Sequence, residues 1–455
     1  MVRTKKIILL LFLCVFVACQ HQTPEEIGVV NGRSISAEEF IFSYETSPRS
    51  VTAGPKETAY AEVLDRLINR VLLSQESQRR GLDQNPETKR ELIYLEDAAI
   101  RRELFRDRIR EKTLIGEDDT RRAYLMAQKT LWIKHIVMKS RLSAKPEFWN
   151  PEWKHESINP GTKSMNSPEF GQVDLVGWND VDTDLESILY DLKLNDWTAP
   201  IEKNGQTHLF RLVNFETNQM VTENQFHEQR EHYQTAMRKR QEHDKSFEFI
   251  QETMKPQNLI IKRPVLEQLT QILWASRVDQ DSLTGSPQGE FKEKVLTLDD
   301  IGSAVLAHFQ SGELTIEDFR FYYQMNPQKL EAEHLDGLRH KLVNAVGIYV
   351  RDEVFAEMGR QAELQHREAV REDYQYWQER LLASKLEQQL FDLAVTQSGA
   401  GEENYKKMAT KDLAELSSIL KDQANIKVDQ ELLLQLKTSD EGLPRKIDFY
   451  TAHLN

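Results

Sequence analysis

Apolar residues change their spacing twice along this 455-residue chain, and that change restricts the class of fold it can adopt. Before residue 130 and after residue 220 they recur every three or four residues, as on the buried side of a helix. Between Leu131 and Phe215 they alternate in two short runs, the pattern of strands with one buried face, and a short helical pattern from Leu185 to Leu192 lies between the runs. The sequence therefore predicts a mostly α-helical fold with one small α+β insert. The residues that carry these patterns are Val63, Leu64, Leu67, Ile68, Val71 and Leu72 in the first helical segment, and Trp132 to Met138 and Thr207 to Val213 in the two strand-like runs.

Turn and cap signals mark where individual elements begin. The segment from Val29 to Phe40 contains an apolar pair, an Asn-Gly turn and then Ser36 before acidic residues, which predicts a strand, a tight turn and a capped helix. Thr222 and Gln225 form a capping-box pair that predicts the start of a long charged helix reaching Met254. Apolar residues are sparse along that helix, so we expect it either to project or to pack along one narrow seam.

An internal repeat is visible after residue 300. Three pairs of segments can be laid on one another without gaps: Ile35 to Tyr44 on Leu314 to Tyr323, Ile68 to Leu95 on Val350 to Trp377, and, more weakly, Asn258 to Lys262 on Asn425 to Asp429. We interpret these matches as a duplicated helical module. The alternative is that amphipathic helices with similar caps simply resemble one another.

The first residues have the pattern of an export signal. Three basic residues, Arg3, Lys5 and Lys6, precede an apolar run that is too short to span a bilayer. The run ends at Ala18-Cys19, which resembles the lipobox of bacterial lipoproteins. We therefore expect residues 1–18 to be a lipoprotein signal peptide and Cys19 to be the lipidated residue. The alternative is an ordinary secretory signal with a chance cysteine.

This interpretation predicts the location of the mature protein. Other apolar segments are too short to cross a membrane, so membrane contact would be through the lipid anchor only. We expect the protein on the periplasmic side of the cell envelope. Gln20, in place of an inner-membrane retention aspartate, favours the outer membrane if the host has two membranes.

Cysteine content and charge exclude several kinds of site. Cys14 would leave with the signal peptide and Cys19 would be acylated, which excludes disulfides, a thiol nucleophile and a cysteine metal site. Loss of the signal lowers the formal charge from −14 to −17, because residues 1–18 carry three basic and no acidic residues. This large negative charge argues against nucleic acid, which is itself negatively charged, as a partner. His227, His232 and His243 lie five and eleven residues apart rather than at metal-binding i, i+4 spacing, so no metal or cofactor is predicted.

The α+β insert carries the most specific motifs. Ile133-Lys134-His135-Ile136-Val137 resembles the opening strand of parvulin-type peptidyl-prolyl isomerases, Ser157 to Thr162 resembles their active-site loop, and Gly205 to His208 resembles their closing strand. The helices around the insert make the whole chain similar to the SurA/PrsA class of exported foldases. This resemblance implies SurA-like helical modules flanking a parvulin domain. It further implies a catalytic set and a substrate pocket, which would comprise His135, Asn159 and His208, and Trp178, Leu185 and Leu189 respectively.

Departures from the parvulin pattern predict a degenerate site. Asn159 takes the place of an acid or thiol and cannot ionise, and Leu185 takes the place of an aromatic pocket wall. The family's glycine-rich stretch is replaced by Phe170-Gly171-Gln172-Val173-Asp174. Two interpretations remain open: a weak isomerase, or a remnant that only binds. A third is that both histidines are core residues and Trp178 fills a small core.

Together these features predict a membrane-anchored extracytoplasmic chaperone that binds unfolded or nascent exported proteins, such as outer-membrane proteins, with weak or absent isomerase activity. The alternative is a structural lipoprotein subunit of an envelope complex. The expected organisation is a signal peptide (1–18), a tether and N-terminal helical module (19–130), a parvulin-like domain (131–217), a long helix and connector (218–300), a second helical module (301–398) and a C-terminal region (399–455).

Overall fold

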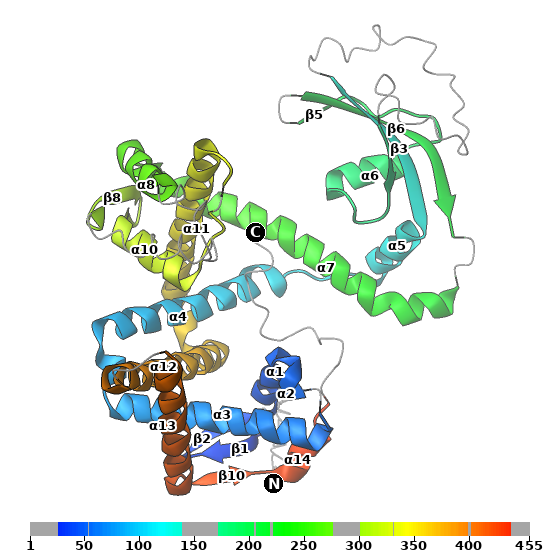
Figure 1. The fold of residues 1–455 in the computed structure, drawn as a ribbon. Coiled ribbons are helices and arrows are strands. Elements are labelled where there is room, and N and C mark those ends of the chain that lie inside the picture. The colour runs from blue at the N-terminus through cyan, green and yellow to red at the C-terminus, as the bar shows by residue number, and fades with distance from the viewer. Residues whose placement is uncertain are drawn as a thin grey trace, which may run out of the picture. The chain divides into compact units, whose positions relative to one another are not determined.

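The computed structural model describes residues 26–52, 54–138, 172–203, 206–218, 222–275, 301–330, 332–398 and 402–437. The chain forms two compact units, a larger one built from the residues up to Leu104 and from Gln257 onward, and a smaller one from Phe105 to Pro256 (Figure 1). The described part is mostly helical with small sheets, which confirms the fold class predicted from the apolar spacing. In these residues no helix is both long enough and apolar enough to cross a membrane.

The larger unit takes its elements from both ends of the chain. Its N-terminal elements are β1 (Glu26–Val30), β2 (Arg33–Ser36), α1 (Ala37–Thr46), α2 (Arg49–Thr52), α3 (Lys56–Arg79), the 3-10 turn η1 (Leu82–Gln84) and α4 (Pro86–Phe105). Its later elements are β7 (Ile260–Ile261), α8 (Arg263–Ala275), β8 (Val305–Phe309), β9 (Gly312–Thr315), α10 (Ile316–Met325), α11 (Leu335–Gln361), η9 (Leu364–His366), α12 (Glu368–Ser398), α13 (Glu402–Gln423), β10 (Ile426–Val428) and α14 (Gln430–Gln435).

The predicted strand, turn and helix at the start of the chain are present. Asn31 and Gly32 have φ of 50° and 88°, the left-handed values that a tight hairpin needs. The Ser36 side chain accepts a hydrogen bond of 3.1 Å from the backbone N–H of Glu39, so it caps α1 as expected.

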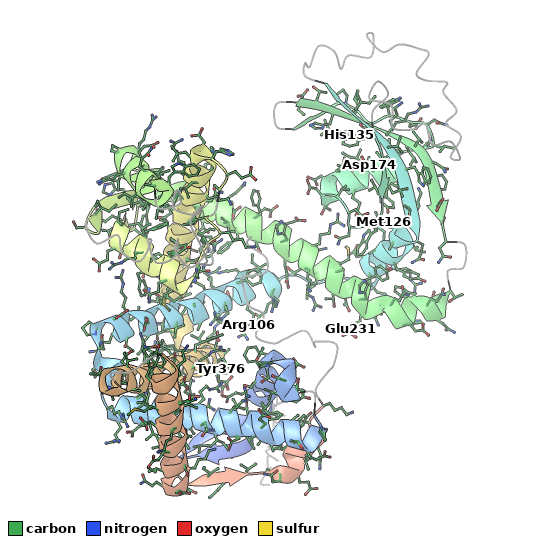
Figure 2. The ribbon with its side chains drawn as sticks, in the orientation of Figure 1. Arg106, Met126, His135, Asp174, Glu231 and Tyr376 are labelled. Carbon is green, nitrogen blue, oxygen red and sulfur yellow. The ribbon has the colours of Figure 1, made fainter. Side chains whose placement is uncertain are left out.

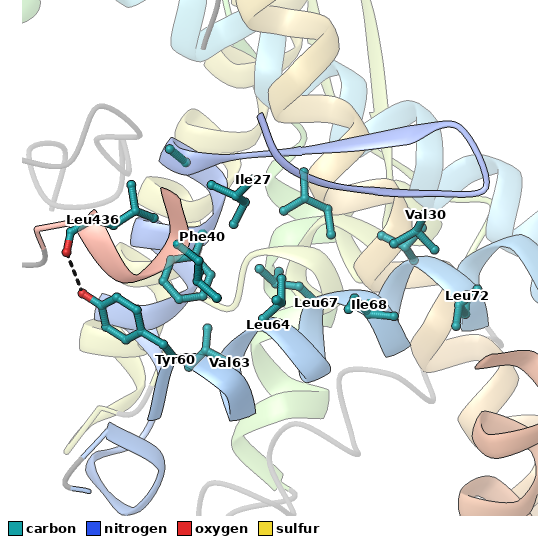
Figure 3. Close-up of a cluster of buried hydrophobic side chains, with 14 of the residues drawn as sticks. Ile27, Val30, Phe40, Tyr60, Val63, Leu64, Leu67, Ile68, Leu72 and Leu436 are labelled. Atoms are coloured by element: carbon teal, nitrogen blue, oxygen red, sulfur yellow. Dashed lines mark hydrogen bonds between the residues drawn. The ribbon is translucent and has the colours of Figure 1, made fainter. Parts of the chain in front are cut away.

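The main core of the larger unit lies between α3, the hairpin and the end of the chain. Ile27 and Val30 of the hairpin face the apolar stripe of α3 (Figure 3). Leu433 of α14 and Leu436, which follows it, complete this cluster, so the C-terminal region contributes to the same core as the N-terminus. The α3 residues in the cluster are Tyr60, Val63, Leu64, Leu67, Ile68, Val71 and Leu72.

The order of the elements agrees with the predicted duplicated module. A β-hairpin, a short helix, a long helix, a 3-10 turn and a second long helix occur twice, as β1 to α4 and as β8 to α12, with α2 as an additional short helix between α1 and α3 in the first run. Two three-stranded sheets have the same organisation, with strand orders β10-β1-β2 and β7-β8-β9. Val428 pairs with Gly28 as Ile261 pairs with Ala307, which reproduces the weak sequence match between these two strands.

Each sheet takes its third strand from the segment that follows the other copy in the sequence. β10 follows the second copy and pairs with β1 of the first, whereas β7 follows the first copy and pairs with β8 of the second. Buried ion pairs join the two copies as well: Arg33 Nε lies 2.7 Å from Glu379 Oε1 of α12. The two copies are therefore interleaved, and neither can complete its sheet alone.

The smaller unit is a four-stranded antiparallel sheet with helices against it. Strand order is β4-β3-β6-β5, and α6 covers one face over an apolar core. The core residues are Leu131, Ile133, Val176, Leu189 and Leu212. The elements are the π-helical turn η2 (Arg106–Arg110), α5 (Glu117–Ala127), β3 (Lys129–Met138), β4 (Gln172–Val176), α6 (Thr183–Asp191), β5 (Ile201–Lys203), β6 (Gln206–Thr217) and α7 (Glu223–Met254).

Helix α7 has the capping box predicted for the long charged helix, and it packs along a narrow seam, one of the two arrangements expected for it. Its capping box is present, because Thr222 Oγ1 accepts from the N–H of Gln225 and Gln225 Oε1 accepts from the N–H of Thr222. Along its length it buries a narrow seam, with Phe226 and Tyr233 packed against Tyr124 of α5.

Candidate functional site

Two histidines meet on the central strands of the smaller unit. His135 of β3 lies opposite Phe210 of β6, and His208 lies opposite Val137, so both histidines share one face of the sheet. His135 Nε2 is 3.0 Å from His208 Nδ1, a hydrogen-bonding distance in which one ring donates and the other accepts. Both rings are half-buried. The predicted approach of the two side chains is therefore present.

The Phe210 ring lies against the His135 ring, and Phe210 was not among the predicted site residues. Its ring stacks on the His135 ring with centroids 4.5 Å apart and planes 4° from parallel. Phe210 also packs against the core under α6, so it connects the histidines to that core. The sequence could have indicated it, because Phe210 comes two residues after His208 in a predicted strand and alternate residues of a strand share a face.

The charge state of His135 is set by its surroundings. Burial lowers the pKa of His135 below its usual 6.5, and His208 lowers it further. Asp174 of β4 acts in the opposite direction and raises it. The net direction favours a neutral His135 ring, which can donate at one nitrogen and accept at the other.

The pocket residues implied by the resemblance lie in two places. Leu185 and Leu189 of α6 belong to the core under the helix, where Leu189 is only 1% exposed and Leu185 is partly buried. Trp178 follows the end of β4 opposite Leu131, whereas His135 pairs with the other end of that strand. Its ring packs 5.4 Å from that of Tyr233 in a separate cluster with α5 and α7. Leu185 and Phe210 thus pack against the same core, whereas the structure does not bring Trp178 to the histidines.

The buried carboxylate of Glu186 holds helix α6 in place through hydrogen bonds. Arg240 of α7 donates to Glu186 at 2.8 Å, and the N–H of Asn179 donates to the other carboxylate oxygen at 2.5 Å. Arg240 also donates to the Thr183 hydroxyl at 2.8 Å. Polar contacts to α7 therefore hold α6 in place in addition to its apolar contacts with the core. Asn159 and Cys19, the other two residues predicted to matter, lie outside the described residues.

The side chains at this site offer noncovalent contacts, from the histidine pair and from the Phe210 ring. Among the described residues, no group of three or more His, Cys, Asp or Glu side chains could hold a metal ion. A hydrogen-bonded histidine pair beside an aromatic ring can bind an uncharged amide and shape the electrostatic field around it. These features together define a mostly helical protein that carries a small antiparallel α+β unit with a histidine pair on its sheet.

No protein-family model matches the chain, and no curated protein is similar enough to count as a match. Among solved structures, one from work on two SurA-like chaperones of Campylobacter jejuni, the virulence factor PEB4 and the periplasmic protein Cj1289, is 18% identical, with 58% of this chain and 100% of that chain covered and a TM-score of 0.19. The peptidylprolyl isomerase PrsA of Bacillus cereus is 14% identical, with 60% and 98% covered and a TM-score of 0.20. The foldase protein PrsA of Streptococcus pneumoniae is 12% identical, with 49% and 89% covered and a TM-score of 0.20.

Proposed function

We propose that the protein is a membrane-anchored extracytoplasmic foldase that binds unfolded or nascent exported proteins and whose smaller unit is a degenerate peptidyl-prolyl isomerase domain. The observation that supports this proposal best is the 3.0 Å contact between His135 and His208 on adjacent central strands. Three short sequence motifs of the parvulin type fall within the residue range of the same unit. The clients would include outer-membrane proteins.

The chemistry explains why such a site can be weak and still recognisable. Rotation of an X-Pro amide crosses a barrier of about 18–20 kcal/mol, and catalysis needs only stabilisation of the twisted amide. The histidine pair can supply polar contacts, and Phe210 supplies an apolar surface beside it. Asn159 cannot ionise, so we propose a rate loss of about tenfold to a hundredfold, or ~1.4–2.7 kcal/mol, relative to a complete site.

Client binding is assigned to the larger unit. It is the greater part of the chain and is built from interleaved helical copies, and it contains neither of the site histidines. Holding an extended client and rotating its prolyl bonds would then be separable activities on separate units.

Aggregation assays with several unrelated unfolded proteins test the chaperone proposal. The mature protein should suppress their aggregation at near-stoichiometric ratios, and His135→Ala with His208→Ala should leave this suppression unchanged. The matched control is His243→Ala, which removes an exposed histidine on α7. Failure to protect any client would favour the structural-subunit alternative.

Fatty-acid labelling tests the anchor separately. Wild-type protein should incorporate a clickable fatty acid, and Cys19→Ala should remain an unlabelled, uncleaved precursor. Equal labelling of the two proteins would refute lipidation at Cys19.

A further inference from the structure

An acid lies on the histidine face of the sheet, on a strand that the resemblance does not assign to the active site. β4 runs antiparallel to β3, with Asp174 opposite Ile133 and Gln172 opposite His135. Because alternate residues of a strand share a face, Asp174 is on the same side of the sheet as His135. Diagonal neighbours across two strands are about 7–8 Å apart at the backbone, within reach of a carboxylate and an imidazole. Figure 2 labels both residues on this unit.

We propose that Asp174 is the acidic partner of the His135–His208 pair, a positioning residue that keeps the pair able to hold a proton. This inference rests on the proposed isomerase-type site and deepens it.

Two imidazoles in direct contact need such a partner. At 3.0 Å between ring nitrogens, the rings can share one proton, but a second positive charge would be strongly opposed. Burial and His208 both lower the pKa of His135, and Asp174 opposes them. Without the carboxylate His135 would lose its proton at a still lower pH.

Other charged groups on the surrounding elements have different positions. Glu186 of α6 is bound by Arg240 and by the N–H of Asn179. Glu202 of β5 accepts from the Thr207 hydroxyl at 2.8 Å, on the face opposite the histidines. Lys134 and Arg211 pair across β3 and β6 on that opposite face as well. Asp174 is thus the described acid that shares the face of His135 and acts on its charge.

The consequence for a bound prolyl peptide is electrostatic. A singly protonated pair places one donor and a stabilised positive charge beside the amide, whereas a fully neutral pair offers only weaker dipoles. The carboxylate does not touch the peptide in this scheme. It acts through His135.

Titration of the histidines by NMR, with ¹³C-labelled histidine in the full mature chain, tests this inference directly. Asp174→Asn should lower the pKa of His135 relative to wild type, and Asp174→Glu should restore it. The matched control, Asp191→Asn, removes an equal charge from α6 next to Tyr190, whose hydroxyl donates to the Lys129 carbonyl at the far end of β3. That control should leave the His135 titration unchanged. An unchanged His135 titration in folded Asp174→Asn would overturn the inference.

A pH profile of prolyl-peptide isomerisation separates this inference from the proposed function. If wild type isomerises the peptide, the rate should fall as the pH rises and His135 loses its proton, and this fall should begin at a lower pH in Asp174→Asn and be unchanged in Asp191→Asn. If wild type shows no isomerisation at any pH, the catalytic part of the proposed function fails, yet the NMR titration still decides the role of Asp174.

Discussion

The hydroxyl of Tyr60 donates a 3.2 Å hydrogen bond to the backbone carbonyl of Leu436, across a sequence separation of 376 residues. Lys56, one turn earlier on α3, donates to the carbonyls of Leu434 and Leu436 at 2.9 Å each. Both donors satisfy carbonyls at the end of α14, which have no partner within the helix. The last described helix is therefore fixed to the first long one.

This attachment predicts that the C-terminal segment stabilises the larger unit. Leu433 is 2% exposed and lies in the core with α3, whereas its neighbour Leu434 is 42% exposed. Leu433→Ala should lower the free energy of unfolding by about 2–4 kcal/mol, because it removes buried apolar surface and leaves a cavity. Urea unfolding of the full chain measures this.

Leu434→Ala is the matched control and should change stability by less than about 0.5 kcal/mol. Equal effects of the two substitutions would contradict the attachment of α14 to the core.

Two glycines of α11 test how closely the interleaved copies pack. A Cβ added at Gly359 would overlap Ile100 Cγ2 of α4, whereas one added at Gly347 meets no described atom within 4 Å. Gly359→Ala should therefore destabilise the protein by about 1–3 kcal/mol through overpacking. Gly347→Ala should stabilise it by up to about 1 kcal/mol, because alanine favours a helix over glycine.

Thermal unfolding of the two variants checks whether their changes in stability have opposite signs. Similar effects for both substitutions would mean that α11 and α4 are not in close contact at Gly359.

Much of the larger unit could be predicted from local patterns, but its interleaving could not. Apolar spacing and caps identify α1, α3 and the repeated hairpin because those signals lie within a few residues of each other. β7 and β10 are two and three residues long, too short to show an alternating pattern. Which strand completes which sheet depends on long-range packing, and only the weak match between Asn258 to Lys262 and Asn425 to Asp429 hinted at it.

In the candidate site too, features set by local motifs could be predicted and features set by long-range packing could not. His135 and His208 could be predicted because their strands carry specific motifs. Trp178 could not be placed, because the aromatic partner that positions it, Tyr233, is on α7 and distant in sequence. Asp174 was visible only as part of a departure from the glycine-rich pattern. Its position opposite Ile133 depends on strand register, which apolar spacing alone did not define.

Acid should destabilise the smaller unit through His135. Burial lowers the folded-state pKa of His135 below the usual 6.5, so the unfolded chain takes up the proton first. The free energy of unfolding should thus be independent of this group well above pH 6.5 and should fall as the pH drops below it. Urea midpoints followed by tryptophan fluorescence between about pH 7.5 and about pH 5.5 measure the effect.

His135→Asn should remove part of this pH dependence, and the exposed-site control His243→Asn should keep it. A smaller unit that becomes more stable on acidification, with the change abolished by His135→Asn, would contradict a lowered pKa of His135 in the folded state.

Isomerisation of a short Ala-Pro peptide by the mature protein tests the account most directly. We predict slow but measurable catalysis in wild type, a faster rate in Asn159→Asp, loss of catalysis in His135→Ala with His208→Ala, and no change in His243→Ala. The reason is that the histidine pair is in place while the acid at position 159 is missing. A wild-type rate equal to that of fully active parvulins, or a rate indifferent to the two histidines, would contradict the proposed degenerate site.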